Sequence, residues 1–146
     1  VSECYPYTAI VGATELGFEE ERPMYKRKPR SLRTAEFRPV RARACDTLIA
    51  AIAGLETADP PLRLRSHHVT EQLISVPSPI EDRTYKHRAD LIDALICAWT
   101  GLLWVRHGLD RCQVLGASNA PSPAATIIAP YRPTQRTATA AGLPAG

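Results

Sequence analysis

The sequence predicts an α/β fold, in which short strands near both ends of the chain enclose long helical segments. Apolar residues recur at helical spacing in three stretches, at residues 8–16, 39–55 and 87–105. Strand-like segments precede and follow them, at residues 1–5, 111–115 and 125–129. A chain of 146 residues with 45% hydrophobic residues forms one domain, or a large part of one, with a real core.

The first predicted strand, at residues 1–5, carries an acid, Glu3, near its carboxyl end. Pro6 ends the strand, because proline cannot donate to a sheet ladder. Thr8 is the expected N-cap of the following helix, and Gly17 is its expected stop. Glu3 therefore stands near a strand's carboxyl end, the edge at which open α/β sheets place their sites. The alternative is a solvated acid on an edge strand.

A basic segment follows, from Arg22 to Arg43. It holds nine of the 18 Lys and Arg residues and a single acid, Glu36. We interpret it as an exposed loop that leads into a helix beginning at Pro39. Such a segment suits phosphate backbones, although it would serve equally as a solvated charge run. It has no base-reading motif, so binding would depend on shape and charge. The candidate nucleic-acid-binding residues are Lys26, Arg27, Lys28, Arg30 and Arg33.

The remaining segments are less informative. Residues 61–85 fit a strand or a helix, with a loop leading into the hydrophobic run. Gly108 is the expected stop of that run. Residues 131–146 are rich in Thr, Ala, Pro and Gly without periodicity, and we predict a disordered tail. The four cysteines are far apart and show no zinc-type spacing. A reduced, cytoplasmic protein is the simplest interpretation.

Two carboxylates, Asp90 and Asp93, stand at the front of the hydrophobic run 87–105. In a helix they lie three residues apart and share one face. If the helix begins there, the acids are ordinary first-turn residues that the helix dipole favours. The apolar residues beside Asp93 argue against that alternative, because a buried acid is costly unless it is paired or bound to metal. Magnesium and manganese prefer such oxygen ligands.

Several of these motifs carry a resemblance to a known family. The D-x-x-D-A pattern at residues 90–94 looks like the last motif of RuvC-type resolvases in the ribonuclease H-like superfamily. ECYPY at residues 3–7, MYKRKPR at 24–30 and DLIDALICAWTGL at 90–102 together resemble a bacterial family catalogued as domain of unknown function 429. Its members are described as predicted ribonuclease H-like nucleases. The resemblance covers residues 1–130.

The resemblance implies a ribonuclease H-like fold, with a mixed sheet flanked by helices, of which residues 1–130 are the C-terminal part. Glu3 matches the strand glutamate of the family site, and Asp90 and Asp93 match its helix acids. Together they would hold Mg²⁺ or Mn²⁺. The family's first-strand aspartate has no counterpart here, so we expect a fold that is incomplete at its N-terminus. An upstream segment or a partner chain would then complete the sheet and the site, unless the molecule is inactive.

Three functions follow as hypotheses. The first is a metal-dependent nuclease that acts on nucleic-acid phosphodiesters, with the basic segment holding the backbone of DNA or RNA. The second is a non-catalytic nucleic-acid-binding or interaction module on the same fold, which the missing aspartate suggests. The third is a structural fragment whose acids only cap a helix.

The hydrophobic run 87–105 is interpreted as a core helix, because its uncharged part is short for a membrane span.

Overall fold

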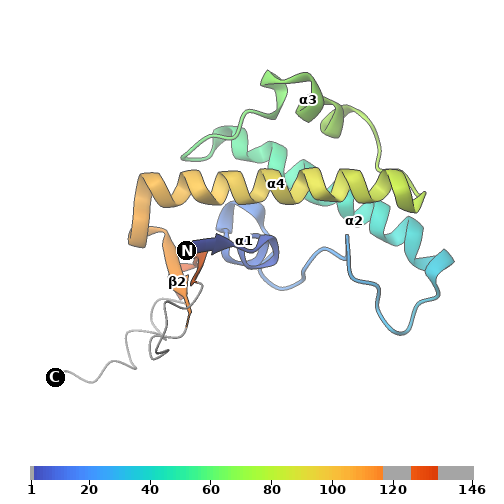
Figure 1. Cartoon of the computed structure of the whole chain (residues 1–146), viewed down its shortest axis with the longest axis horizontal. Helices are drawn as coiled ribbons and strands as arrows, with labels where there is room; N and C mark the ends of the chain where they lie inside the picture. The colour runs from blue at the N-terminus through green and yellow to red at the C-terminus, as the bar shows by residue number, and fades with distance from the viewer. Residues whose placement is uncertain (1, 117–125, 135–146) are drawn as a thin grey trace.

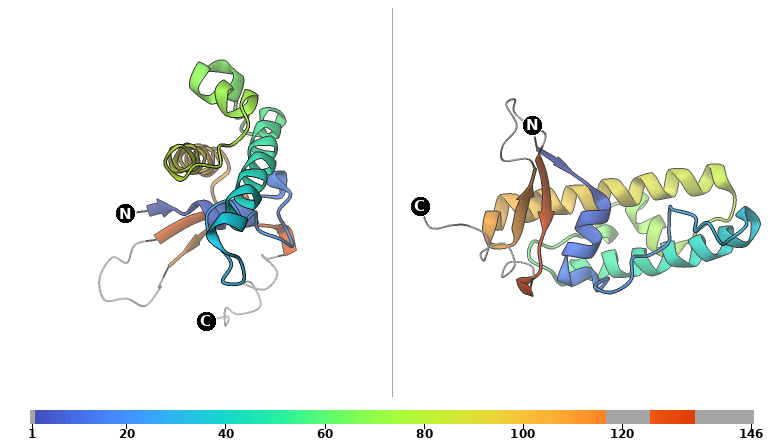
Figure 2. Two further views of the ribbon diagram at one scale, coloured as in Figure 1. Left: turned by 90° about the vertical axis from the view of Figure 1, so that its right-hand side faces the viewer. Right: turned by 90° about the horizontal axis from the view of Figure 1, so that it is seen from below.

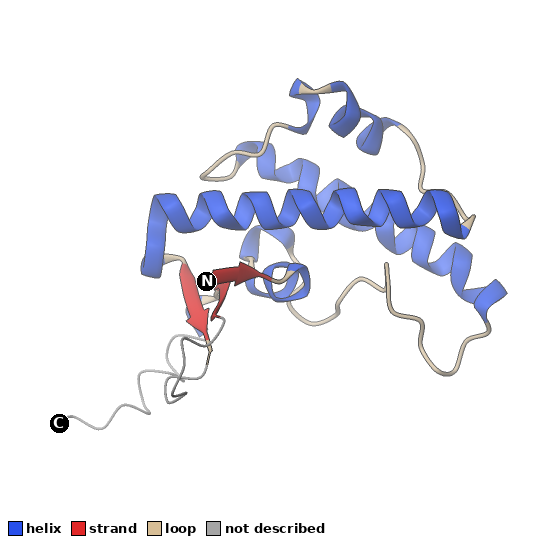
Figure 3. Ribbon diagram, in the orientation of Figure 1, coloured by secondary structure: helices blue, strands red, loops and turns tan. Residues whose placement is uncertain are grey.

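The computed structural model describes residues 2–116 and 126–134, and the α/β class is confirmed there (Figure 1). Helices make up most of the described fold, and the strands form one small sheet (Figure 3). In chain order the elements are β1 (Ser2–Cys4), α1 (Pro6–Gly12), α2 (Thr34–Gly54), α3 (His68–Ser75), α4 (Asp82–His107), β2 (Cys112–Leu115) and β3 (Thr126–Pro130).

The sheet is mixed, and its order differs from the order of the strands in the chain. The last strand, β3, lies in the middle, parallel to β1 and antiparallel to β2. Glu3 of β1 is opposite Ile127, and Val114 of β2 is opposite Ile128. The strands gather at one end of the helical part of the molecule, beside the C-terminal half of α4 (Figure 2). The two ends of the described chain thus meet in one sheet.

Helix α1 begins three residues earlier than expected. Pro6 occupies its first turn and Tyr5 is the extended N-cap residue, so Thr8 is not the cap. The Thr8 hydroxyl instead donates to the Tyr5 carbonyl at 2.7 Å. The helix also ends early, at Gly12, and a separate 3-10 turn (Thr14–Leu16) follows. A proline with fixed φ favours the first helical turn, and this preference outweighed the weaker capping signal of threonine.

Gly12 allows α1 to lie directly on the sheet. A Cβ atom added at Gly12 would stand 2.1 Å from the Pro130 carbonyl oxygen of β3. Any side chain would therefore push the helix off the strand. This close approach fixes the start of the chain, which includes β1, against its last strand.

The long helices α2 and α4 both begin about one turn before the predicted positions. Glu36 accepts a hydrogen bond from the Arg33 backbone N–H at 2.9 Å and so caps α2 ahead of Pro39. Pro39 then lies inside the helix, where it removes one backbone hydrogen bond. Helix α4 begins at Asp82, whose carboxylate forms ion pairs with Arg38 and Arg41 of α2. A local cap thus accounts for the early start of α2, and ion pairs with α2 stabilise the early start of α4.

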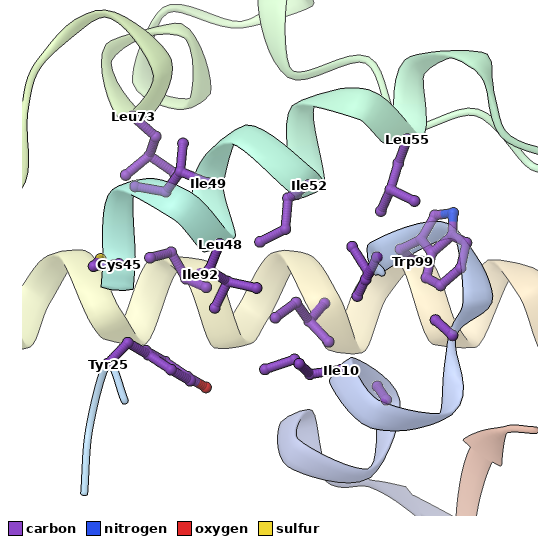
Figure 4. Close-up of a cluster of buried hydrophobic side chains, with 14 of the residues drawn as sticks. Ile10, Tyr25, Cys45, Leu48, Ile49, Ile52, Leu55, Leu73, Ile92 and Trp99 are labelled. Atoms are coloured by element: carbon purple, nitrogen blue, oxygen red, sulfur yellow. The ribbon is translucent and has the colours of Figure 1, made fainter. Parts of the chain in front are cut away.

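The core lies between α2, α4 and α1 (Figure 4). Trp99 of α4 is completely buried, and its indole N–H donates to the Pro60 carbonyl at 2.9 Å. The largest fully buried apolar side chains besides Trp99 are Ile10, Tyr25, Leu48, Ile52, Leu55, Ile92, Ile96 and Leu103. The apolar spacing of the three predicted helices is therefore confirmed as the source of the core.

Further sequence predictions about the helices can be compared with the described residues. The stretch at residues 61–85, whose sequence fits a strand or a helix, contains the helix α3. Gly108 ends α4, as predicted, with a positive φ of 53°. Neither α4, the longest helix, nor any other helix in residues 2–116 and 126–134 has the length and hydropathy that a membrane span requires.

The tail expected at residues 131–146 lies mostly outside the described residues. Its first four residues are described, and two of them, Tyr131 and Arg132, are held by hydrogen bonds to other parts of the fold. The Tyr131 hydroxyl donates to the Asp110 carbonyl at 2.7 Å, and the Arg132 guanidinium donates to the Val11 carbonyl, also at 2.7 Å. The ordered part of the fold therefore extends at least two residues past the predicted boundary.

Candidate functional site

Asp90 and Asp93 lie on one face of α4 and converge on a single cation, the Lys26 ammonium. Lys26 Nζ donates to Asp93 Oδ2 and lies 3.8 Å from Asp90 Oδ1. The other oxygen of Asp93 accepts a hydrogen bond from the Tyr25 hydroxyl at 2.8 Å. The Asp93 side chain is 26% exposed and that of Asp90 is 58% exposed, so both carboxylates can be reached from solvent.

The position of the acids in the helix differs from the prediction. Because α4 starts at Asp82, Asp90 and Asp93 lie roughly two to three turns from its N-terminus, beyond the reach of the helix dipole. They are therefore not first-turn acids, and helix capping does not explain them. Their environment comes from the loop that carries Tyr25 and Lys26.

Tyr25 holds this loop against α4. Its ring is completely buried, and its backbone carbonyl accepts a hydrogen bond from the Tyr85 hydroxyl of α4. On its other side it contacts Tyr7 of α1, with 5.5 Å between the ring centroids. The buried tyrosine fixes the backbone of the next residue, Lys26, beside Asp93. This anchoring residue was not among the predicted site residues, and its only sequence signal was its place in MYKRKPR.

The charge of Asp93 acts on the two tyrosines next to it. Burial, and then the hydrogen bond to Asp93, raise the pKa of Tyr25 well above its ordinary value. Burial, followed by the negative charge of Asp93, also raises the pKa of Tyr7. Both phenols therefore stay protonated at neutral pH, and Tyr25 remains a donor to the carboxylate.

Strand β1 approaches the same face of α4 through Cys4. Its carbonyl lies 3.6 Å from the sulfur of Cys97, which is one turn beyond Asp93. Burial, followed by the interaction with Cys4, raises the pKa of Cys97 to about 12. Because side chains alternate along a strand, Glu3 belongs to the sheet face opposite that of Cys4. The sequence could not reveal this orientation, since it depends on how the strand faces the helix.

The three predicted metal ligands are consequently not brought together. In the part of the chain that the structure describes, no three His, Cys, Asp or Glu side chains form a group that could hold a metal ion. Asp90 and Asp93 are brought together, and the exposed Glu3 does not join them. Two carboxylates around one cation position fit a single Mg²⁺ or Mn²⁺ ion, which proteins often bind through one or two carboxylates plus substrate phosphates.

The five predicted nucleic-acid-binding residues have different environments. Lys26 is engaged by the acid pair, Arg33 pairs with Glu36, and Lys28 donates to the Leu32 carbonyl at 2.8 Å. Arg27 and Arg30 are exposed, and no acidic side chain of the described residues forms an ion pair with either of them. The basic segment is therefore partly structural.

A pocket of about 270 Å³ opens between the start of α1 and this loop. Its lining combines aromatic and cationic side chains without an acid, and comprises Tyr5, Tyr7, Arg22, Pro23, Met24, Arg27, Lys28 and Pro29. The rings of Tyr5 and Tyr7 are 5.9 Å apart, and the Arg22 guanidinium lies 5.9 Å from the centre of the Tyr7 ring. Sequence spacing alone did not reveal the pocket, because the pocket joins the ECYPY segment at residues 3–7 to the basic loop.

The acid pair and the pocket share one loop, since Lys26 contacts the two carboxylates and the next residues, Arg27 and Lys28, line the pocket. Comparisons with known proteins do not name this site, since no family model, curated protein or solved structure matches this chain. The function is therefore inferred from the geometry of the site and from the motifs in the sequence.

Proposed function

We propose that this chain belongs to a metal-dependent nuclease of ribonuclease H-like type, which acts on nucleic-acid phosphodiesters. The observation that carries the proposal is the convergence of Asp90 and Asp93 on the Lys26 ammonium. Two carboxylates around a cation, on a rigid helix and beside a cationic pocket, suit the recognition of a metal ion together with a phosphate.

The family motifs point in the same direction. DLIDAL places Asp90 and Asp93 on α4, and YK of MYKRKPR supplies their two partners, Tyr25 and Lys26. Two motifs that carry the resemblance, distant in the sequence, are thus in direct contact. The mixed sheet, whose central strand β3 contacts α1 and α4, is compatible with a ribonuclease H-like arrangement, which we keep as part of the proposal.

In the proposed activity, Asp90 and Asp93 hold one Mg²⁺ or Mn²⁺ ion. The ion would supply charge stabilisation for phosphodiester cleavage when bound. Tyr25 orients Asp93 by donating to one carboxylate oxygen, which leaves the other oxygen for the cation. The cationic side chains of the loop bind the nucleic-acid backbone. Glu3 would take part only through a rearrangement of β1, so we assign it no ligand role in this arrangement.

A calorimetric titration with Mn²⁺ tests the metal site. Asp93→Asn should weaken binding roughly tenfold or more, because it removes an anionic ligand but keeps the hydrogen bond from Tyr25. Glu71→Gln is a matched control, since it neutralises an exposed acid on α3, on the other side of α4 (Figure 1). Equal binding by the wild type and Asp93→Asn would show that the assignment is wrong.

Cleavage of labelled DNA and RNA oligonucleotides with Mn²⁺ tests the activity itself. Product should form with the wild type and with Glu71→Gln, and should be lost with Asp93→Asn. Cleavage that survives in Asp93→Asn would come from another site or from a contaminant, and would contradict the proposal.

One observation favours a second candidate, a non-catalytic nucleic-acid-binding or interaction module on the same fold. Lys26 already neutralises the acid pair, and no third acidic ligand joins it within the described residues. Such a module would bind oligonucleotides with an affinity that falls steeply with salt. It would not cleave them, and Asp93→Asn would not change its affinity for manganese.

A further inference from the structure

We propose that the pocket lined by Tyr5, Tyr7, Arg22, Arg27 and Lys28 binds one unstacked nucleotide, so that the nucleic acid is single-stranded where it meets this site. The inference rests on the proposed function, because it names the form of the nucleic acid that the site recognises. It goes beyond a general basic surface, since it assigns the base and the phosphate to different side chains of a single pocket.

Tyr5 is the proposed platform for the base. Its side chain is 51% exposed although it is large and aromatic, and it is held beside Tyr7 at a ring distance of 5.9 Å. Its contribution to α1 is made through the backbone, as an N-cap residue without a side-chain hydrogen bond. The ring is therefore free to stack with a ligand. Stacking on tyrosine accepts any base, because every base has a flat π surface.

The phosphate is assigned to the cationic side of the pocket. Arg22 lies over the Tyr7 ring, and Arg27 lines the pocket beside it. Lys28 is anchored at its tip by the Leu32 carbonyl. These contacts place three cations around two aromatic rings. Guanidinium groups match the geometry of phosphate oxygens, which favours a nucleotide over a neutral aromatic ligand.

The size and the position of the pocket agree with this ligand. About 270 Å³ is close to the lower end of the volumes of small-ligand pockets, roughly 300 Å³, and suits one nucleotide better than several. The pocket also lies next to the acid pair along the chain, because Arg27 and Lys28 line it and the preceding residue, Lys26, contacts Asp90 and Asp93. A strand that placed one base on Tyr5 would therefore have its backbone near the proposed metal site.

The requirement for a single strand follows from the access to the base. In a duplex the faces of the bases are covered by their neighbours, and a base must leave the stack before it can contact an aromatic ring. A pocket that read only phosphates would bind the two forms through charge alone, and would not need Tyr5. The ring and the cations thus make separable predictions.

Fluorescence anisotropy in EDTA tests the inference without any metal or cleavage. The probes are a short single-stranded oligothymidylate, an abasic oligonucleotide of the same length, a duplex and heparin. Tyr5→Leu should weaken binding of the oligothymidylate about tenfold and leave the abasic strand and heparin unchanged. Arg27→Ala should weaken binding of all four. The control Arg65→Ala, which removes an exposed cation outside the pocket, should change none.

Tyr5→Trp provides a second variant that keeps an aromatic ring, and it should bind the oligothymidylate at least as tightly as the wild type. The inference is overturned if Tyr5→Leu weakens the normal and abasic strands equally, or affects neither. It is also overturned if the wild type prefers the duplex. If the wild type does not cleave with manganese but Tyr5→Leu still weakens oligothymidylate binding, only the nuclease proposal is contradicted. If the wild type cleaves but Tyr5→Leu binds as tightly as the wild type, only this inference is contradicted.

Discussion

Two charged residues of α4, Arg88 and Asp93, lie on opposite sides of the helix, and their partners differ in kind. On the side of α3, Arg88 is only 8% exposed. Its guanidinium donates to the Leu73 carbonyl at 2.6 Å, to the Ser78 hydroxyl at 2.9 Å and to the Val76 carbonyl. All of these partners are neutral, and all belong to α3 or to the loop that follows it. Arg88 therefore attaches one part of the fold to another.

On the opposite side, Asp93 is half-buried and has one charged and one neutral partner, Lys26 and Tyr25. Lys26 is partly exposed, so a soluble cation can compete with it. A charge enclosed by backbone carbonyls serves the structure, because nothing from solvent can replace its partners. A charge whose partner can exchange is suited to binding. The comparison predicts a large stability cost on the Arg88 side and a ligand effect on the Asp93 side.

The largest effect on stability is expected for Arg88→Met. The substitution keeps an unbranched side chain but removes the donors to Leu73, Val76 and Ser78, which leaves buried acceptors unsatisfied. We expect a loss of about 2–4 kcal/mol in the free energy of unfolding. Urea unfolding measures this loss of stability, and calorimetry of manganese binding to the same variant is the second readout. A loss below about 1 kcal/mol would show that Arg88 is not the structural charge inferred here.

Tyr25→Phe should have a smaller effect, about 1–2 kcal/mol, because it removes one hydrogen bond to a half-buried carboxylate and keeps the packed ring. A double-mutant cycle with Asp93→Asn isolates the interaction between the two side chains. The two losses should not add, since both variants alter the same contact. Strict additivity would mean that the hydroxyl and the carboxylate stabilise the fold independently.

Lys26→Met should change stability by about 1 kcal/mol or less, because a partly exposed ion pair contributes little. The affinity for Mn²⁺ should instead rise, since the ammonium no longer competes for Asp90 and Asp93. Calorimetry on the same preparation measures both quantities. If the variant binds manganese more weakly than the wild type, Lys26 assists the metal site and the contrast with Arg88 needs revision.

The smallest effect concerns the Cys97 thiol, one turn beyond Asp93. Burial, Cys4 and the charge of Asp93 raise its pKa to about 12, so the thiol is protonated at neutral pH and should react slowly with iodoacetamide. The folded state retains this proton more strongly than the unfolded state. Its contribution to stability is therefore present below the ordinary thiol pKa of 9.0 and is lost as the pH rises toward 12. Asp93→Asn should slightly accelerate the alkylation; an unchanged rate would argue against the influence of Asp93.

Much of the fold could be predicted from local signals. Apolar spacing located the helices around Leu48 and Ile92, and Gly108 ended α4 as expected. All three helix starts were placed too late: Pro6 begins α1 and the Glu36 cap begins α2, both local features, whereas α4 begins at a residue paired with another helix. Asp82 begins α4 while it pairs with Arg38 and Arg41, and these partners are 44 and 41 residues away.

The sequence predicted only the part of the candidate site that depends on residues close together in the chain. Helical periodicity is a local property, so it placed Asp90 and Asp93 on one face. Tyr25 and Lys26 could not be recognised as their partners, because 68 and 67 residues separate them from Asp93. The sequence also grouped Glu3 with the acids, whereas its orientation depends on which face of β1 packs against α4.

By itself, the sequence determined the α/β class, the apolar faces of the helices and the shared face of the two aspartates, since each depends on the spacing of residues a few positions apart. The tertiary structure alone decided that β3 lies between β1 and β2, that Arg88 is enclosed by carbonyls and that Lys26 faces the acids. Those outcomes depend on contacts between distant segments. They are selected by the joint packing of α1, α2 and α4 rather than by any local pattern.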